Sequence, residues 1–202
     1  LSLKINGVER FVLCDPEEDS LAVVLRRMGL TGVKIGCGTG VCGACSVLLN
    51  GEVVRSCTKK MKRIPESSEI TTIEGIGTPQ HLHPLQQAWI TYGGVQCGFC
   101  TPGLIVPEYG LFAENPSPTR EDVRKWFKDH HNICRCTGYK PLVDAVMAAA
   151  KVMRGEATMD DITYHFESDG EEIYGSRYPR PTALAKVTGL ADYGDDVKLQ
   201  MP

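Results

Sequence analysis

The sequence lacks a long apolar run, a strong net charge and any repeated segment. No stretch approaches about 18 consecutive apolar residues, the length typical of a membrane-spanning helix, so the sequence predicts no membrane span. A formal net charge of −3 gives no electrostatic reason to expect binding to nucleic acid or to a membrane. With no fixed-period repeat and no low-complexity tract, and with 42% hydrophobic residues, we expect one large or two small globular domains.

No secretion signal is visible either, which bears on how the cysteines are read. Nine cysteines among 202 residues is a high number, and eight of them fall into two compact groups. In a reducing compartment this pattern favours metal binding over disulfide bonds, so we expect a cytoplasmic metalloprotein. Residue 1 is Leu rather than Met, and we therefore expect that a few N-terminal residues are missing or have been removed.

The first cysteine group lies in a glycine-rich segment, residues 36–57, which reads GCGTGVCGACSVLLNGEVVRSC. Its spacing is C-x4-C-x2-C-x11-C, and the first three cysteines match a plant-type 2Fe–2S ferredoxin loop. The glycines allow backbone N–H groups to approach negatively charged sulfur atoms closely. Disulfides or a zinc site are the alternatives, but zinc sites usually use two short cysteine pairs and only one is present. We predict a 2Fe–2S cluster with four ligands: Cys37, Cys42, Cys45 and Cys57.

A predicted hairpin brings the fourth cysteine back to the other three. The Asn-Gly pair at residues 50–51 lies between two β-rich runs, which is the strongest short signal for a two-residue hairpin turn. In that register Leu49 faces Glu52, and Cys45 consequently faces Ser56. Cys57 follows directly, so its thiolate is expected beside the cluster loop.

The rest of residues 1–75 predicts a small α+β domain around this loop. Two strands, LSLKIN and ERFVLC, flank another Asn-Gly hairpin signal at residues 6–7. The segment SLAVVLRRMGL has one apolar helical face, with Asp19 or Ser20 as its N-cap. With a last strand near residues 70–73, this order of elements fits a β-grasp ferredoxin fold.

Residues 80–155 change to helical periodicity after a joint rich in turn residues at 73–80. Helices are expected to begin at Pro84, near Pro102, after a capping box of Thr119 with Asp122, and near Pro141. The sequence therefore predicts an all-α four-helix domain.

Two similar interruptions of these helices hold the second cysteine group. One reads CGFCTPG and the other CRCTGYKP, and each sets a cysteine pair just before a proline-started helix. Helix N-termini carry partial positive charge and free N–H donors, which suit an anionic cluster. Zinc is again the alternative. We predict a second 2Fe–2S cluster with four ligands: Cys97, Cys100, Cys134 and Cys136.

Several other features receive no metal role. Cys14, on the second predicted strand, is expected to be a small buried hydrophobe. The basic segment 58–63 is either an ordinary solvated surface or a docking strip for an acidic electron partner. Because each group already has four cysteines, no histidine is assigned as a ligand; His130 and His131 are expected at an exposed helix end.

The last part of the chain, residues 156–202, is expected to be an extended linker followed by a turn-rich segment. Its first half, residues 156–172, is acidic and only weakly periodic. The second half is too short to bury a core of its own. It should therefore lie against something larger.

The eight-cysteine pattern over residues 1–155 resembles the paired 2Fe–2S domains of molybdenum hydroxylases, the family of xanthine oxidases and aldehyde oxidoreductases. The motifs are CGTGVCGACSV with Cys57, then QCGFCTPG, then CRCTGYKP. The tail segment YPRPTALAKVTGLADYGDD looks like the opening of the molybdenum-binding part. Since no flavin domain intervenes, the arrangement resembles the flavin-free aldehyde oxidoreductases of anaerobic bacteria.

The resemblance implies a function. An aldehyde and water would give a carboxylic acid at a molybdenum–pterin centre, of the cytosine dinucleotide type, and electrons would leave through two 2Fe–2S clusters. Gln96 and Cys136 would lie beside the pterin, and no catalytic residue would belong to this chain. The implied partners are a molybdenum-binding domain or subunit, a flavodoxin or ferredoxin as electron acceptor, and a second copy of the full enzyme.

Two other functions remain as alternatives. The chain could be the separate small iron–sulfur subunit of a molybdenum hydroxylase that acts on an N-heterocycle or on carbon monoxide. Residues 176–202 argue against it, since such subunits are expected to end soon after the four helices. The other alternative is a zinc-stapled binding module without catalysis, which would lack visible absorption.

Overall fold

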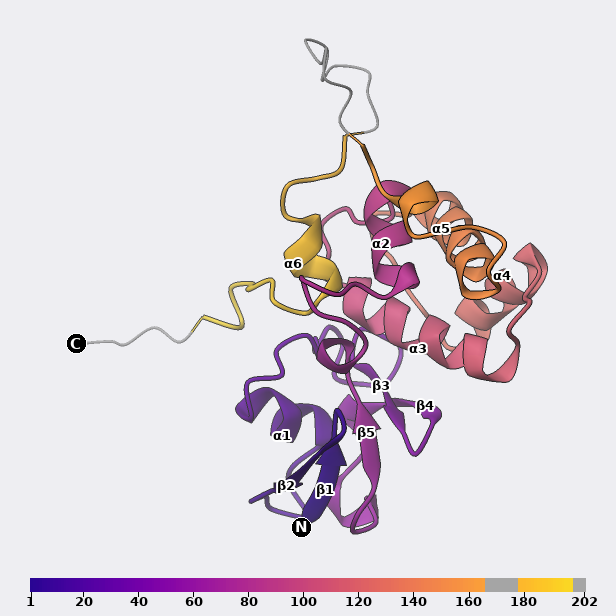
Figure 1. Ribbon diagram of the computed structural model, residues 1–202. Coiled ribbons are helices and arrows are strands. Elements are labelled where there is room, and N and C mark those ends of the chain that lie inside the picture. Colours follow the sequence, from indigo (N-terminus) through magenta and orange to yellow (C-terminus); the bar gives the residue numbers. More distant parts are fainter. Residues whose placement is uncertain (166–177, 198–202) are drawn as a thin grey trace.

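The computed structural model describes residues 1–165 and 178–197 (Figure 1). An N-terminal unit contains five strands and one helix: β1 (Ser2–Ile5), β2 (Val8–Phe11), α1 (Leu21–Arg27), β3 (Ser46–Leu49), β4 (Glu52–Arg55) and β5 (Glu69–Thr71). A helical unit follows: α2 (Pro84–Thr91), α3 (Thr101–Glu114), α4 (Arg120–Asp129) and α5 (Tyr139–Met153), and then the short α6 (Ala183–Val187). The expected β-grasp fold followed by four helices is confirmed.

Both predicted hairpins form with the expected turns. The strand order in the sheet is β2-β1-β5-β3-β4, with β1 and β5 parallel and the other neighbours antiparallel. The second hairpin turns at Asn50 and Gly51, whose φ values of 52° and 86° identify a type I′ turn. Leu49 pairs with Glu52 as predicted. Beyond the strands, the N–H and the hydroxyl of Ser56 both donate to the carbonyl of Cys45.

The second strand is shorter than predicted, which moves Cys14 off the sheet. β2 ends at Phe11 because its partner β1 begins at Ser2, its register partner. Leu13 is 96% exposed, whereas Cys14 is half-buried against the core of the sheet. The last strand is also displaced, since β5 ends at Thr71 and the following residues form a 3-10 turn.

The sheet is covered on both faces at β3. Side chains of α1 pack with those of β1, β3 and β5 in one hydrophobic core. Leu48, in β3, and Val53, in β4, belong instead to the core of the helical unit, where α3 lies across the sheet (Figure 1). Burial of apolar surface on both faces therefore joins the two units.

The helix starts follow the sequence signals closely. The side chain of His83 accepts from the N–H of Leu85 just before α2, and Pro84 is the first helical residue. Thr119 and Asp122 form the predicted capping box of α4. α3 and α5 begin at Thr101 and Tyr139, close to the starts expected near Pro102 and Pro141, although neither proline is the first residue of its helix.

The tail is less extended than predicted. Residues 160–162 form a 3-10 turn whose Ile162 is buried in the helical core, and the hydroxyl of Thr91 in α2 donates to the Ile162 carbonyl. The remaining part of the predicted linker, residues 166–177, lies outside the described residues. The later segment does lie against something larger, because α6 packs on α2 and α3.

The described helices are too short or too polar to cross a bilayer.

Candidate iron–sulfur sites

The first cysteine loop surrounds the sulfur of Cys37 with backbone donors. The N–H groups of Thr39, Val41 and Cys42 each lie 3.4 Å from this sulfur. Gly38, at φ 68°, allows the chain to curl around the sulfur in this way. Three amides directed at one thiolate are the kind of nest that stabilises a cluster ligand.

The other three cysteines of this group lie close by. The N–H of Cys57 points at the sulfur of Cys45 at 3.5 Å, so the hairpin does return the fourth cysteine as predicted. A Cβ placed on Gly36 would come within 3.0 Å of the sulfur of Cys42, which shows why a glycine precedes the loop.

The thiols of this group differ in acidity because their surroundings differ. The hydroxyl of Thr39 and the backbone amides lower the pKa of Cys37 to about 5. Burial raises the pKa of Cys45 to about 12, and the neighbouring Cys57 and Cys42 thiols add to that effect. Iron ligation requires thiolates and therefore displaces a proton from Cys45.

The second group comes from two loops that precede helices. Cys97 and Cys100 lie just before α3, and Cys134 and Cys136 lie just before α5. The backbone N–H and side chain of Cys97 lower the pKa of the Cys136 thiol, whereas burial and the adjacent Cys134 and Cys97 raise that of Cys100. These interactions place all four side chains of the predicted group next to one another.

Tyr139 holds the second of these loops, and the sequence analysis did not identify it. Its hydroxyl accepts from the N–H of Cys134 at 2.7 Å and donates to the carbonyl of Asn132 at 3.3 Å. Since Tyr139 is the first residue of α5, the helix itself fixes the backbone that carries Cys134.

The two cysteine groups meet where the two units touch. The N–H of Ile133 donates to the carbonyl of Cys42 at 3.2 Å, which joins the loop of the first group to that of the second. Gly103, in the first turn of α3, packs so closely that a Cβ there would lie 2.5 Å from the carbonyl oxygens of Gly43 and Ala44. The contact requires a glycine in the helix.

The chemistry of the two donor sets fits iron–sulfur clusters. Each group offers four cysteine sulfurs, and a 2Fe–2S cluster takes four thiolates shared over its two irons. Within residues 1–165 and 178–197, no three Cys, His, Asp or Glu side chains are arranged to hold a single metal ion.

Gln96 lies next to the second cysteine group. Its amide nitrogen would lie 2.5 Å from a Cβ placed on Gly138, in the loop that carries Cys136. The backbone carbonyl of Gln96 accepts a hydrogen bond from the ammonium of Lys186, in α6, at 3.0 Å. Gln96 thus lies against the loop that carries Cys136, and the place of both residues beside a pterin stays a prediction.

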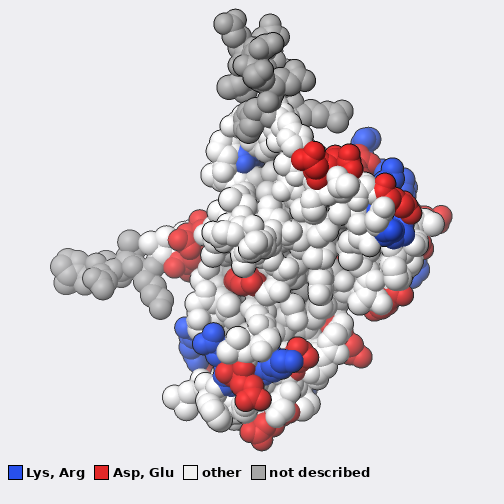
Figure 2. Space-filling model, in the orientation of Figure 1, with Lys and Arg blue, Asp and Glu red and all other residues white. Residues whose placement is uncertain are grey.

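The basic segment 58–63 is partly neutralised. The ammonium of Lys62 pairs with Glu17 at 2.5 Å, and that of Lys60 donates to the carbonyl of Glu18. On the face shown in Figure 2, basic and acidic side chains are interspersed near the sheet and over the helices, with mostly uncharged surface between. These interactions favour an ordinary solvated surface over a docking strip for this segment, because they use two of its lysines within the chain.

Two family models match consecutive parts of the chain. A "2Fe-2S iron-sulfur cluster binding domain" matches residues 3–71, and a "[2Fe-2S] binding domain" matches residues 72–147.

Known proteins resemble the chain over different lengths. It is 56% identical to the aldehyde oxidoreductase of Megalodesulfovibrio gigas over 99% of this chain and 22% of that protein. It is 38% identical to the nicotinate dehydrogenase small FeS subunit of Eubacterium barkeri, over 75% of this chain and 94% of that subunit. The crystal structure of the aldehyde oxidoreductase from Desulfovibrio desulfuricans superposes with a TM-score of 0.95 and 58% identity, over 100% of this chain and 22% of that one.

The chain thus spans about a fifth of the length of the aldehyde oxidoreductases that it matches and nearly the whole of a small iron–sulfur subunit. The fold, the order of the two cysteine groups and these likenesses agree. The chain belongs to the iron–sulfur portion of the molybdenum hydroxylase family, to which the xanthine dehydrogenases also belong.

Proposed function

We propose that this chain is the electron-transfer portion of a molybdenum–pterin aldehyde oxidoreductase, which converts an aldehyde and water to a carboxylic acid. The observation that carries the proposal is the extent of the similarity. The match to the aldehyde oxidoreductase continues through the tail, whereas the match to the nicotinate dehydrogenase subunit covers only 75% of this chain. The tail is where the proposed molybdenum-binding part would begin.

The proposed iron ligands are the two cysteine groups. One cluster would be held by Cys37, Cys42, Cys45 and Cys57, and the other by Cys97, Cys100, Cys134 and Cys136. Such clusters pass one electron at a time, which suits a centre that releases two. The proposed domain limits are residues 1–75, 80–155 and 156–202.

The chain's own residues would determine how the clusters are used. The amides at Cys37 stabilise a negatively charged sulfur, and burial shields Cys134 from water, while Cys100 is half-buried. Gln96 and Cys136 would face the pterin, which makes the second cluster the one nearer to molybdenum. The first cluster, whose Cys37 is exposed, would then be the exit.

The same proposal includes partners and location. A flavodoxin or ferredoxin would accept electrons at the exposed Cys37 loop, in the cytoplasm. The molybdenum-binding domain or subunit would carry the pterin, of the cytosine dinucleotide type, and the full enzyme would form a homodimer.

Rapid-freeze spectroscopy of the whole enzyme mixed with aldehyde tests this order. A Cys57→Ser variant should still reduce its second cluster, while turnover with a protein acceptor nearly stops. A Cys136→Ser variant should also disturb the pterin side. If the Cys57 variant stays folded and loaded with molybdenum but fails to reduce its remaining cluster, the order is wrong.

A substrate screen separates this function from its alternative. Reduction of the clusters by aldehydes supports the proposal. Reduction by N-heterocycles or carbon monoxide, with no response to aldehydes, would assign the chain to the other type of hydroxylase.

A further inference from the structure

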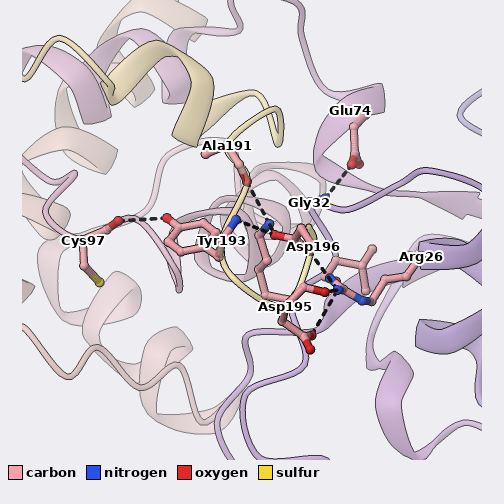
Figure 3. A network of polar contacts seen from close by, with 10 residues as sticks. Arg26, Gly32, Glu74, Cys97, Ala191, Tyr193, Asp195 and Asp196 are labelled. Carbon is pink, nitrogen blue, oxygen red and sulfur yellow. Dashed lines mark hydrogen bonds and ion pairs between the residues drawn. The ribbon is translucent and has the colours of Figure 1, made fainter. Parts of the chain in front are cut away.

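The described part of the tail holds the loop that carries the first cysteine pair of the second group. Tyr193 donates its hydroxyl proton to the carbonyl of Cys97 at 2.8 Å (Figure 3). Lys186 donates to the carbonyl of the preceding residue, Gln96, at 3.0 Å. Gly98 follows Cys97 in the chain, and a Cβ on Gly98 would come within 2.7 Å of the Tyr193 hydroxyl oxygen. The loop and the tail are therefore fitted to each other.

A buried ion pair ties the same tail to the first cysteine loop. The ammonium of Lys34, three residues before Cys37, lies 2.7 Å from the carboxylate of Asp196. Both side chains are almost fully buried, at 2% and 1% exposed. Lys34 also donates to the carbonyl of Ala191 at 2.9 Å and lies 4.7 Å from the centre of the Tyr193 ring.

Further contacts fix the carboxylate and the ring of this network. Arg26, from α1, forms an ion pair with Asp196 at 2.8 Å, and the N–H of Tyr193 donates to Asp196 at 2.9 Å. The Tyr193 ring meets Phe99 edge to face, with 5.3 Å between centroids. A buried ion pair adds little net stability but fixes one geometry, because breaking it leaves an uncompensated charge. The network therefore sets where the phenol of Tyr193 points.

None of these tail residues lies within the segments that the two family models match, which end at residue 147. The match to the nicotinate dehydrogenase small FeS subunit likewise covers only 75% of the chain. The cysteine motifs alone therefore carry no information about the tail.

We propose that residues 183–196 contribute to the function of the second cluster site. Tyr193 and Lys186 position the Cys97 loop and raise the reduction potential of the cluster. This inference rests on the proposed function, because it requires that the second cysteine group holds a cluster. Reduction adds negative charge to a cluster. The nearby ammonium of Lys186 and the hydrogen bond that Tyr193 donates to the backbone carbonyl of the ligand Cys97 therefore favour the reduced state. Tyr193 and Lys186 are positioning residues, since the hydrogen bonds by which they hold this loop go to backbone carbonyls and not to a cysteine sulfur.

Two conservative variants of the whole protein, loaded with iron and sulfide, test this proposal. Tyr193→Phe removes the hydroxyl but keeps the ring against Phe99. Lys186→Met removes the charge but keeps the length of the side chain. Redox titration followed by electron paramagnetic resonance should show a lower potential for the second cluster in both variants and an unchanged potential for the first. Lys186→Arg, which keeps a donor and a charge, should restore the original value.

Lys125→Met is the matched control, because Lys125 is an exposed cation of α4 paired with Asp129. It should move neither potential. Equal second-cluster potentials in the wild type, Tyr193→Phe and Lys186→Met would overturn the inference while leaving the proposed function intact. A wild type that holds only one cluster would instead overturn the proposed function, and this inference with it.

Discussion

The side chain of Asn132 donates to the carbonyl of Gly103 at 3.1 Å, at the point where Pro107 has left that carbonyl without a helical partner. In a regular helix the N–H four residues later would occupy it, but proline has no N–H. Asn132 lies in the loop before Cys134. The Gly103 carbonyl, which has no helical donor, therefore anchors the second cysteine loop to α3.

A double-mutant cycle tests whether the side chain of Asn132 takes the place of the missing N–H of residue 107 as the donor to the Gly103 carbonyl. Asn132→Ala should lower the free energy of unfolding by about 1–3 kcal/mol, because it leaves a buried carbonyl unpaired. Adding Pro107→Ala restores an N–H that can donate to Gly103 and should recover part of that loss. The measurement is denaturant unfolding of both single variants and the double variant.

Pro107→Ala alone is the control, since it changes the helix while Asn132 remains in place. A double variant whose stability equals the sum of the two single effects would show that the two donors do not compete for the carbonyl.

Cys14 should have no part in metal binding. It is half-buried at the edge of the sheet core, and the structure places it in no cysteine group. Cys14→Ser should therefore keep four irons per chain, two for each cluster, whereas Cys57→Ser should lose the first cluster. Iron analysis with visible spectroscopy checks both variants. Loss of iron from a folded Cys14→Ser variant would contradict the assignment.

The metal-free protein should show a large difference in reactivity between Cys37 and Cys45. A lowered pKa keeps a thiol ionised as the pH falls, so with a pKa of about 5 Cys37 is a thiolate throughout the neutral range. Cys45, with its pKa near 12 and its side chain buried, stays protonated. Iodoacetamide at pH 6 should alkylate Cys37 first, as read by mass spectrometry.

Thr39→Val is the matched variant for this experiment, because the Thr39 hydroxyl is the largest cause of the shift. It should move the alkylation of Cys37 to higher pH. Labelling of Cys37 and Cys45 at one common pH would refute the assigned acidities.

Glu108 should make stability depend on pH. This side chain of α3 is completely buried and accepts from the indole N–H of Trp89 at 2.8 Å, and burial raises its pKa well above the usual value. The folded state therefore holds a proton that the unfolded chain releases as the pH rises, so unfolding becomes easier above the normal pKa of a glutamate.

Glu108→Gln keeps the acceptor for Trp89 but has no proton to release. The free energy of unfolding of this variant relative to the wild type should increase between pH 5 and pH 8, by at most about 1.4 kcal/mol per pH unit. Denaturant unfolding at several pH values gives the difference. A constant difference over this range would mean that Glu108 does not titrate as its burial requires.

Local signals in the sequence were sufficient for much of the fold and for the cysteine groups. Each depends on residues close together in the chain: an Asn-Gly pair fixes a hairpin and its register, and Thr119 with Asp122 fixes a helix start. Short spacings between cysteines work in the same way. The wrong details, such as the length of β2, arise where the partner strand and not the local pattern sets the limit.

What could not be predicted depends on contacts between distant residues. Lys34 and Asp196 are 162 residues apart, and neither has a local pattern that marks it as buried. The role of Asn132 depends on a proline in another helix. Tyr139 lies inside the recognised motif CRCTGYKP, so its closeness to Cys134 in sequence was a usable signal, but its hydroxyl contacts depend on the fold of the loop.

The position of β3 has a consequence for how the protein unfolds. Val47 contributes to the core under α1, while its neighbour Leu48 belongs to the core under α3. If the helices melted alone, Leu48 and Val53 would become exposed on the open face of the sheet. The two units should therefore lose structure cooperatively, and calorimetry of the metal-free protein should show a single heat-absorption peak. Two separate peaks would show that the sheet survives without its helical cover.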